Sequence, residues 1–434
     1  MPLLRSWETG FEARLRAFVG TGAPEPAVRD AAAAVIADVR RRGDAAVLAA
    51  TAKFDGARLT AAKLRIPEAE LAAAAKALPA DRRRALAAAI ASVRDFHRRT
   101  LPKGWTARNR HGALVGERHL PIRRCGLYIP GGQVPLVSTV VMTAVPADVA
   151  GVPEVVACTP PGPGGAVHPD LLAALHLCGV REAYRVGGIQ AIAAMALGTA
   201  SVPAVDKVFG PGNAYVTEAK RQLFGEVGVD LLPGPSEVMV IADRTADPAW
   251  VAADLCAQAE HGSGKEKLYL VTDRAELPAE VLAEAARQCA SLAHGAKVRR
   301  ILDDRLLTVL VRRLGDAAGV ANLVAPEHLE LMVAPARVAG LAGAITTAGA
   351  MLLGHETPTV LGDFVAGPSH TLPTGGGGRF FSGLRVTDFL RRTSVVRYDA
   401  RSLRKAAPTV AAFAAMERLD AHGRSLAIRL GKRR

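Results

Sequence analysis

Short apolar runs rich in β-branched residues alternate with helical stretches from about residue 112 onward, and this alternation limits the fold most. We expect strands at 126–130, 154–158, 183–186, 206–209, 238–243, 267–272 and 322–325. Helical patterns lie between them at 170–178, 189–197, 213–223, 248–260 and 278–293. Strand followed by helix with short connections is typical of doubly wound parallel sheets. These are more strands than one sheet usually holds, so we expect an α/β fold with two sheets.

Helical spacing also marks both ends of the chain. Residues 25–100 are rich in Ala and Arg, and one apolar stripe is formed by Val28, Ala32, Val35, Ile36 and Val39. A Gly-Asp pair at 43–44 and prolines at 67 and 79 divide this region into several helices. The last segment, from about 402 to 430, is helical with a basic finish.

The formal net charge of +14 raises the question of nucleic-acid binding. The basic residues are spread along the chain, and only 4% of residues are aromatic, so no basic and aromatic side chains interleave as in a single-strand platform. We therefore expect solvated surface charge and no nucleic-acid partner. No apolar stretch of roughly 18 residues is free of Pro or charge, so we expect no membrane partner. The first residues lack a hydrophobic leader, which favours the cytoplasm.

The five cysteines are scattered, odd in number and without a C-x-x-C pair. This pattern argues against a disulfide framework and against a thiolate zinc site. We expect small buried thiols in a reducing compartment at Cys125, Cys158, Cys178, Cys256 and Cys289.

Two glycine turns follow expected strands and open expected helices. The dinucleotide fingerprint G-x-G-x-x-G is absent. Gly210-Pro211-Gly212-Asn213 could present backbone amides to a phosphate at a helix N-terminus. Alternatively the segment only turns, with Asn213 as the N-cap residue. The segment VGGIQAIA at 186–193 has the same layout, which leaves both interpretations open.

Gln258 and His261 lie three residues apart near the end of an expected helix, and Asp254 lies on the same stripe. The helix dipole favours a cation there, and Gly262 is suited to end the helix. Against a metal site, a His in the last turn often caps backbone carbonyls, and Gln is an uncommon ligand. The stretch alone leaves both readings open.

Other polar clusters offer further chemistry. Adjacent Glu327 and His328 form a possible acid–base pair on a turn after an apolar strand. Asp363 and His370 lie in a Gly-rich loop. Each cluster also has a structural interpretation as a surface acid, a turn Asp or a capping His.

Glu417 and His422 lie five residues apart, about 140° around an ideal helix, so they share a pocket only if the helix deforms. The histidines without such neighbours are expected to be structural: 97, 111, 119, 168, 176, 294 and 355. His, Gln and Asp ligands suit Zn²⁺, with Mn²⁺ or Co²⁺ as alternatives.

Taken in order, these segments resemble the histidinol dehydrogenase family from about residue 25 to 430. The motifs are GLYIPGG, GGIQAIAA, FGPGNAYVTEAKR, GPSEVMVIAD, QAEHG, PEHLEL, GDFVAGPSHTLPT, SGL and ERLDAH. The resemblance implies two incomplete Rossmann-like domains, one inserted in the other. It places an N-terminal segment at 1–24, the first domain at 25–127 and 237–383, an inserted NAD-binding domain at 128–236, and a C-terminal dimerisation tail at 384–434.

The family oxidises L-histidinol through the aldehyde to L-histidine at the end of histidine biosynthesis, with two NAD⁺ reduced. The resemblance implies a homodimer with one zinc per shared active site. It marks the zinc ligands as Gln258, His261, Asp363 and His422, the last from the partner subunit. The same four residues, with Ser236, His328 and Glu417, are implied to contact substrate. Tyr128, Gln190 and Asn213 are implied to contact NAD.

The resemblance also implies roles for the acid–base pair. His328 removes the alcohol proton in the first oxidation, and Glu327 activates the water that adds to the aldehyde in the second. Three positions depart from the family pattern: Thr143 and Asp148 stand where Asn and Lys are common, and Ser369 where Asn is usual. These departures put individual contacts to the cofactor or within loops in doubt more than the reaction itself.

Three alternatives remain. A relative within the family could oxidise another small polar alcohol, such as a sulfonated diol. A zinc hydrolase would use Glu327 and turn over without NAD⁺. A nucleic-acid-binding protein would show steep salt dependence.

Overall fold

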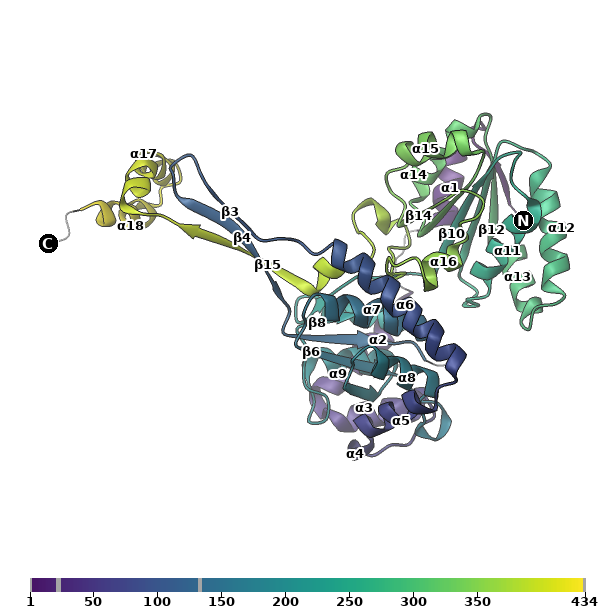
Figure 1. The fold of residues 1–434 in the computed structure, drawn as a ribbon, viewed down its shortest axis with the longest axis horizontal. Coiled ribbons are helices and arrows are strands. Elements are labelled where there is room, and N and C mark those ends of the chain that lie inside the picture. The colour runs from purple at the N-terminus through teal and green to yellow at the C-terminus, as the bar shows by residue number, and fades with distance from the viewer. Residues whose placement is uncertain (1, 21–24, 132–134, 432–434) are drawn as a thin grey trace.

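The computed structural model describes residues 2–20, 25–131 and 135–431. It contains two helix-covered sheets and an arm that projects from one of them (Figure 1). This architecture confirms the predicted α/β class with two doubly wound sheets. Across the described residues, no helix combines the length and apolar character needed to cross a lipid bilayer.

The first sheet is parallel throughout and has the order β1-β12-β11-β10-β13-β14. Its strands are β1 (Leu3–Arg5), β12 (Leu306–Leu310), β11 (Lys267–Thr272), β10 (Glu237–Ala242), β13 (His328–Met332) and β14 (Ala350–Leu353). Side chains alternate between two cores, because successive residues of a strand face opposite sides. Met239 and Ile241 face one core, while Val238 and Val240 face the other.

Helices cover both faces of this sheet. One core packs α1 (Phe11–Val19), α14 (Ala317–Val324) and α15 (Pro335–Ala344). The other packs α11 (Pro248–Ala259), α12 (Leu277–Cys289) and α13 (Gly295–Arg305). The short helix α16 (Thr359–Phe364) follows β14.

The second sheet has the order β2-β7-β6-β5-β8-β9, with only β2 antiparallel to its neighbour. Its strands are β2 (Arg65–Ile66), β7 (Glu182–Arg185), β6 (Glu154–Thr159), β5 (Arg124–Tyr128), β8 (Lys207–Phe209) and β9 (Gly228–Val229). One face carries α5 (Glu68–Ala77), α6 (Ala80–Arg99), α7 (Val137–Val149) and α8 (Pro169–Leu177). The other carries α2 (Pro26–Arg42), α3 (Asp44–Phe54), α9 (Gly188–Leu197) and α10 (Ala214–Leu223), and α4 (Ala61–Leu64) precedes β2.

The packing groups residues 25–127 differently from the expectation, which joined them to 237–383. Helices α2, α3, α5 and α6 pack on helices of the second sheet, because the apolar stripe of α2 is buried in the core of that sheet through Ala32, Ile36 and Val39. β1 instead joins the first sheet beside β12. One unit is inserted in the other, but the inserted unit begins near residue 26 rather than 128. Of the expected 1–24 segment, residues 1 and 21–24 lie outside the described residues.

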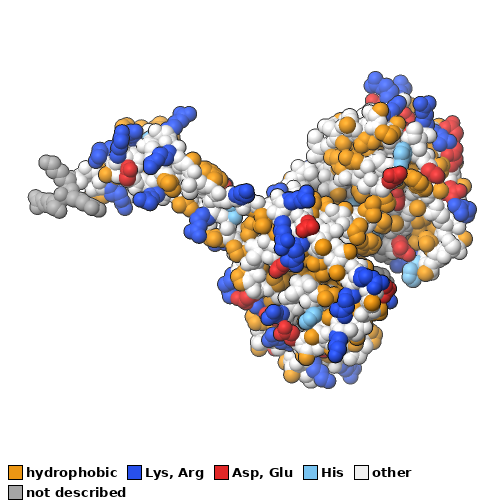
Figure 2. Space-filling view, in the orientation of Figure 1, with side chains coloured by type: hydrophobic (Ala, Val, Ile, Leu, Met, Phe, Trp, Pro, Cys, Tyr) orange, Lys and Arg blue, Asp and Glu red, His pale blue; other side chains and the backbone are white. Residues whose placement is uncertain are grey.

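The arm combines segments far apart in the sequence. β4 (Leu114–Pro121) pairs antiparallel with β3 (Trp105–Arg108) and with β15 (Leu390–Arg397). Two helices, α17 (Ala400–Met416) and α18 (Asp420–Leu430), pack on each other at its end (Figure 1). Basic side chains gather along the arm with apolar ones among them (Figure 2). The largely exposed apolar side chains include Val396, Phe413, Met416 and Ile428.

Several local expectations are wrong. The segment 322–325 ends helix α14 instead of forming a strand, and the left-handed backbone of Ala325 (φ +52°) then turns the chain into β13. His328 therefore begins a strand that follows a helix. Glu417 and His422 lie in different elements, because the chain turns at Arg418 (φ +54°) between α17 and α18. The cysteine expectation is confirmed, since all five thiols are free and buried.

Candidate active site

A cavity of about 230 Å³ lies where the two sheets meet. The second sheet lines it with Pro130, which follows β5, and with Gly212 and Asn213, which follow β8. The first sheet contributes Ser236 and Glu327, which precede β10 and β13. The carboxyl ends of one sheet thus face the amino ends of the other. β5 and β8 flank the point where the second sheet reverses its strand order, the usual ligand position in doubly wound sheets.

The first glycine turn is held by a buried ion pair. The N–H of Gly210 donates to Asp230 Oδ2 at 2.7 Å, and its carbonyl accepts from Lys220 Nζ at 2.5 Å. Lys220 Nζ and Asp230 Oδ1 are 2.6 Å apart, with both side chains fully buried. Gly210 has φ +109°, and a Cβ there would lie 2.2 Å from the carbonyl oxygen of Tyr128. Only glycine fits this turn.

Asn213 caps α10, as one interpretation predicted, because its Oδ1 accepts from the backbone N–H groups of Tyr215 and Val216. It also lines the cavity, so capping and ligand contact are compatible.

The second glycine turn gathers the other two residues implied to contact NAD. The hydroxyl of Tyr128 accepts from the N–H of Gly188 at 3.2 Å. Buried Gln190 donates to Asp55 Oδ2 at 3.2 Å. Burial raises the pKa of Asp55 to about 6. The structure thus places Tyr128 and Gln190 at one turn, beside a carboxyl group that sequence reasoning missed.

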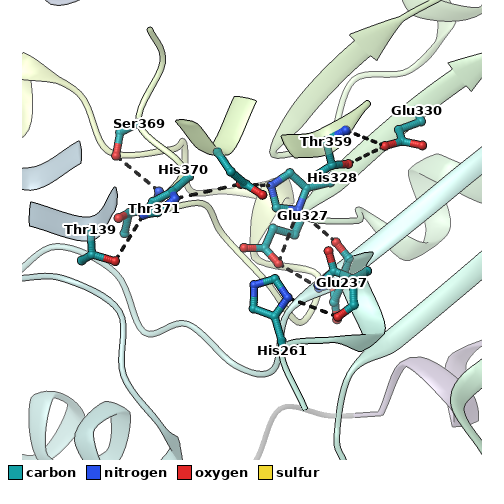
Figure 3. A network of polar contacts seen from close by, with 12 residues as sticks. Thr139, Glu237, His261, Glu327, His328, Glu330, Thr359, Ser369, His370 and Thr371 are labelled. Carbon is teal, nitrogen blue, oxygen red and sulfur yellow. Dashed lines mark hydrogen bonds and ion pairs between the residues drawn. The ribbon is translucent and has the colours of Figure 1, made fainter. Parts of the chain in front are cut away.

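Glu327 and His328 lie at the amino end of β13 and are both nearly inaccessible. Glu327 Oε2 accepts from the N–H of Glu237 at 2.8 Å, and His328 Nδ1 lies 3.3 Å from the carbonyl oxygen of Glu237. Two backbone groups of one β10 residue therefore fix both side chains (Figure 3). His328 Nδ1 is 3.8 Å from Glu327 Oε2, and its Nε2 is 3.6 Å from Asp363 Oδ1.

The two groups titrate abnormally because they are buried together. Burial raises the pKa of Glu327 to about 7, although the charge of His328 opposes the rise. Burial lowers the pKa of His328, but the charge of Glu327 and the hydrogen bond with Asp363 outweigh it and raise that pKa to about 9. Such displaced values mark functional sites, since a general base near neutral pH must be tuned away from an ordinary carboxyl group.

Three histidines surround Asp363. His328 lies closest, His370 Nδ1 is 4.0 Å from Asp363 Oδ1, and His261 is near enough for its charge to act on the carboxyl group. Burial raises the pKa of Asp363, but the hydrogen bond and charge of His328 and then the charges of His370 and His261 bring it below the usual value. Burial lowers the pKa of His370 to about 4. Asp363 lies in α16 rather than in a loop, and His370 approaches it from the segment that follows.

The three departures from the family pattern all have polar partners, and those of Ser369 and Thr143 lie near His370. Ser369, next to His370, donates to the carbonyl of Met142 at 3.0 Å. Thr143 donates to the carbonyl of Thr139, whose own hydroxyl lies 3.4 Å from His370 Nε2. Asp148 pairs with Arg94, where a Lys would repel that guanidinium.

One chain does not assemble the four implied zinc ligands. Gln258 is buried at the end of α11, and His261 Nδ1 lies 3.2 Å from the Gln258 carbonyl oxygen, so the capping interpretation of this helix end also holds. His422 and Glu417 are exposed on the arm, far from α11 and α16 (Figure 1). Among the described residues, no group of three or more His, Cys, Asp or Glu side chains is arranged to hold a metal ion.

Sequence reasoning also missed Lys220, Asp230 and Glu237. For Asp230 and Glu237 the signal was present, since each is a charged residue at an apolar run. Lys220 lies among polar residues, and no local pattern marked it as buried.

Two doubly wound sheets with a buried Glu–His pair at the cleft between them are an arrangement suited to a two-sheet α/β enzyme. The chain matches the family model described as histidinol dehydrogenase over residues 22–430. It is 45% identical over 432 residues to the histidinol dehydrogenase of Nitrobacter winogradskyi, covering 99% of this chain and 100% of the relative. It is 46% identical over 345 residues to the histidinol dehydrogenase of Synechococcus sp., covering 80% of this chain and 79% of the relative.

The fold agrees with this match. A crystal structure of histidinol dehydrogenase from Elizabethkingia anophelis superposes with a TM-score of 0.92 at 31% identity, covering 99% of this chain and 98% of the other. The chain belongs to the histidinol dehydrogenase family, and it is an oxidoreductase.

Proposed function

We propose that this chain oxidises L-histidinol through L-histidinal to L-histidine, with two NAD⁺ reduced and with zinc as the resident metal. The observation that carries the proposal is the Glu327–His328 pair, buried beside a cavity whose other wall is the Gly210–Asn213 turn. An alcohol oxidation by hydride transfer needs a base beside the carbinol and a nucleotide site opposite it. The Glu327–His328 pair supports the first requirement, and the glycine turn on the opposite wall supports the second.

His328 is the base of the first oxidation. It removes the hydroxyl proton while hydride leaves the same carbon for the nicotinamide ring. Its Nδ1 bonds the backbone carbonyl of Glu237, and its Nε2 points toward the Asp363 carboxylate. The Asp363 carboxylate helps to keep His328 protonated, so a cation on Asp363 would lower the pKa of His328 toward the range of a working base.

Glu327 is the base of the second oxidation. Water must add to the aldehyde before a second hydride can leave. A carboxyl group with a pKa of about 7 is a far better base than an ordinary Glu. Its burial also keeps bulk water away from the reactive aldehyde.

The residues present fit a metal. Gln258 has a buried side-chain amide nitrogen without a hydrogen-bond partner among the described residues, so the amide is free to rotate and present its oxygen. Together with His261 and Asp363, it forms a nitrogen and oxygen donor set suited to Zn²⁺. Zinc bound there would hold the amino and imidazole nitrogens of the substrate. One chain supplies only three of the four implied protein ligands.

We infer that a second copy of the chain supplies the fourth ligand. His422 and Glu417 lie on an arm whose helices leave Phe413, Met416 and Ile428 mostly exposed. An arm of this length with uncovered apolar side chains is typical of a dimer interface. His422 of one copy then completes the zinc site of the other, and Glu417 joins Ser236 in contacting the substrate.

The remaining assignments follow from the cleft. Asn213 contacts NAD from the cavity wall, while Tyr128 and Gln190 do so from the second glycine turn. The five free thiols agree with a protein that works in the cytoplasm. We propose no nucleic-acid or membrane partner. The second candidate, oxidation of another small polar alcohol such as a sulfonated diol, shares this chemistry and differs only in pocket contacts.

Replacement of His328 by Asn tests the proposal. The variant loses the base but keeps a polar side chain of similar size, so turnover with histidinol and NAD⁺ should fall on the order of 10²–10⁴-fold. His176→Asn, at an exposed histidine, is the matched control and should keep full activity. An unchanged rate in His328→Asn, with its fold intact by circular dichroism, would remove His328 from the mechanism.

A further inference from the structure

Two neighbouring carboxyl groups interact beside the residues of the proposed active site. Asp254 lies in α11 and Glu330 in β13, and their side chains hydrogen-bond each other. Glu330 is only 1% exposed, and Asp254 is partly buried. An ionised carboxylate has no hydrogen to donate, so a hydrogen bond between the two needs a proton on one of them. Two like charges in contact, one of them buried, cannot both ionise, and the pair therefore shares one proton.

The other oxygen of Glu330 is bound to a third element. Its Oε1 accepts from the N–H of Thr359 at 2.8 Å and from the Thr359 hydroxyl at 2.5 Å. Thr359 is the first residue of α16, and its side chain is buried (Figure 3). One carboxyl pair thus ties together a helix of the first sheet, a central strand and the short helix α16.

Each of these elements carries a residue of the proposed site at a matching position. Gln258 is one turn beyond Asp254 in α11, and Asp363 is one turn beyond Thr359 in α16. His328 is two residues before Glu330, on the same face of β13. The contacts of the pair therefore link the three elements that carry these site residues.

We propose that Asp254 and Glu330, joined by one shared proton and bonded to Thr359, are positioning residues that set the spacing of Gln258, His328 and Asp363. The inference rests on the proposed zinc site. The raised pKa of Asp254, about 8 through burial and then the charge of Glu330, agrees with a proton held at neutral pH.

If the pair shares one proton, the site should tolerate replacement of the Glu330 carboxyl group by an amide. Glu330→Gln keeps an oxygen for Thr359 and supplies an N–H for Asp254, so it copies the protonated pair. Glu330→Leu keeps the approximate volume and removes both contacts. Thr359→Val removes only the hydroxyl donor and leaves the backbone N–H.

The control is a buried carboxylate of the same sheet that has nothing to do with the site. Asp243 follows β10 at its carboxyl end and accepts from the N–H and hydroxyl of Thr245 and from the N–H of Ala334. Asp243→Ala should lower the melting temperature without changing metal affinity.

The experiment measures Zn²⁺ affinity of the full-length protein by calorimetric titration after removal of metal with a chelator. Glu330→Leu should weaken binding about 10–100-fold, the usual effect of losing groups that orient metal ligands. Thr359→Val should weaken it less, and Glu330→Gln should stay within about threefold of the parent. The parent kcat should be restored in Glu330→Gln and not in Glu330→Leu.

The outcomes separate the two proposals. If the parent chain binds no zinc, the proposed function fails before the variants matter. If the parent binds zinc and both Glu330→Leu and Thr359→Val bind it equally well, the positioning role is refuted. Zinc binding by Glu330→Gln as weak as that of Glu330→Leu would refute the shared proton. Should Glu330→Leu fail to fold, Thr359→Val and Glu330→Gln still decide the matter.

Discussion

Replacing Lys220 by Met tests how the cofactor turn is held. The ammonium group of Lys220 lies 2.6 Å from Asp230 and 2.5 Å from the carbonyl oxygen of Gly210, in a place without solvent. Met keeps the volume and removes the charge. The buried Asp230 carboxylate then keeps the hydrogen bond from the Gly210 N–H but loses its counter-ion. The Gly210 carbonyl loses the hydrogen bond from Lys220. Breaking a buried ion pair from one side costs about 3–5 kcal/mol, so we expect a loss of that size in the free energy of unfolding.

Urea denaturation and steady-state kinetics together provide the assay. Because Gly212 and Asn213 continue from this turn into the cavity wall, the KM for NAD⁺ should rise on the order of tenfold, while that for histidinol changes little. Lys265→Met is the control, since its ion pair with Glu25 is exposed to solvent and contributes little to stability.

A second variant isolates the buried charge. In Lys220→Met/Asp230→Asn no unpaired charge remains, and the amide can still accept from the Gly210 N–H, so part of the lost stability should return. The reasoning is refuted if Lys220→Met unfolds like the parent, or if the double variant is no more stable than the single one.

Three further predictions concern other parts of the chain. His97 is fully buried, neither ring nitrogen has a hydrogen-bond partner among the described residues, and burial lowers its pKa to about 4. As the pH falls, His97 takes up a proton near pH 6.5 in the unfolded chain but not in the folded chain. The free energy of unfolding of the parent should therefore fall by up to about 3 kcal/mol relative to that of His97→Leu between pH 7 and pH 4. Parallel curves of unfolding free energy against pH would contradict this. Mixing His261→Ala chains with His422→Ala chains should restore some activity through heterodimers, and no recovery after verified exchange would place His422 in its own subunit's site. Gly210→Ala should destabilise the fold by more than Gly179→Ala, because both have positive φ but only the first would bring a Cβ into the backbone of a neighbouring strand; equal losses would argue that only the backbone angle matters.

The sequence predicted strands of both sheets well because these strands and the helices between them are short, regular and closely connected. Strands expected at 154–158 and 267–272 are found at Glu154–Thr159 and Lys267–Thr272. Asn213 caps its helix as its residue type suggests. Asp363 and His370, which were expected in one loop, lie near each other, although Asp363 belongs to α16.

The rest depended on contacts between distant segments. An apolar stripe such as that of α2 fits any apolar surface, so sequence could not tell which sheet would receive it. The run 322–325 is apolar enough for a strand, but in the structure it forms the last turn and C-cap of α14. The arm forms because β4 pairs with β15 from the other end of the chain, and no local pattern records such a pairing.

The most direct test of the account is the stoichiometry of NADH formed from L-histidinol by the purified, zinc-loaded protein. We expect two NADH for each histidinol consumed, with histidine as the product. No NADH from histidinol, with turnover of another small polar alcohol instead, would contradict it.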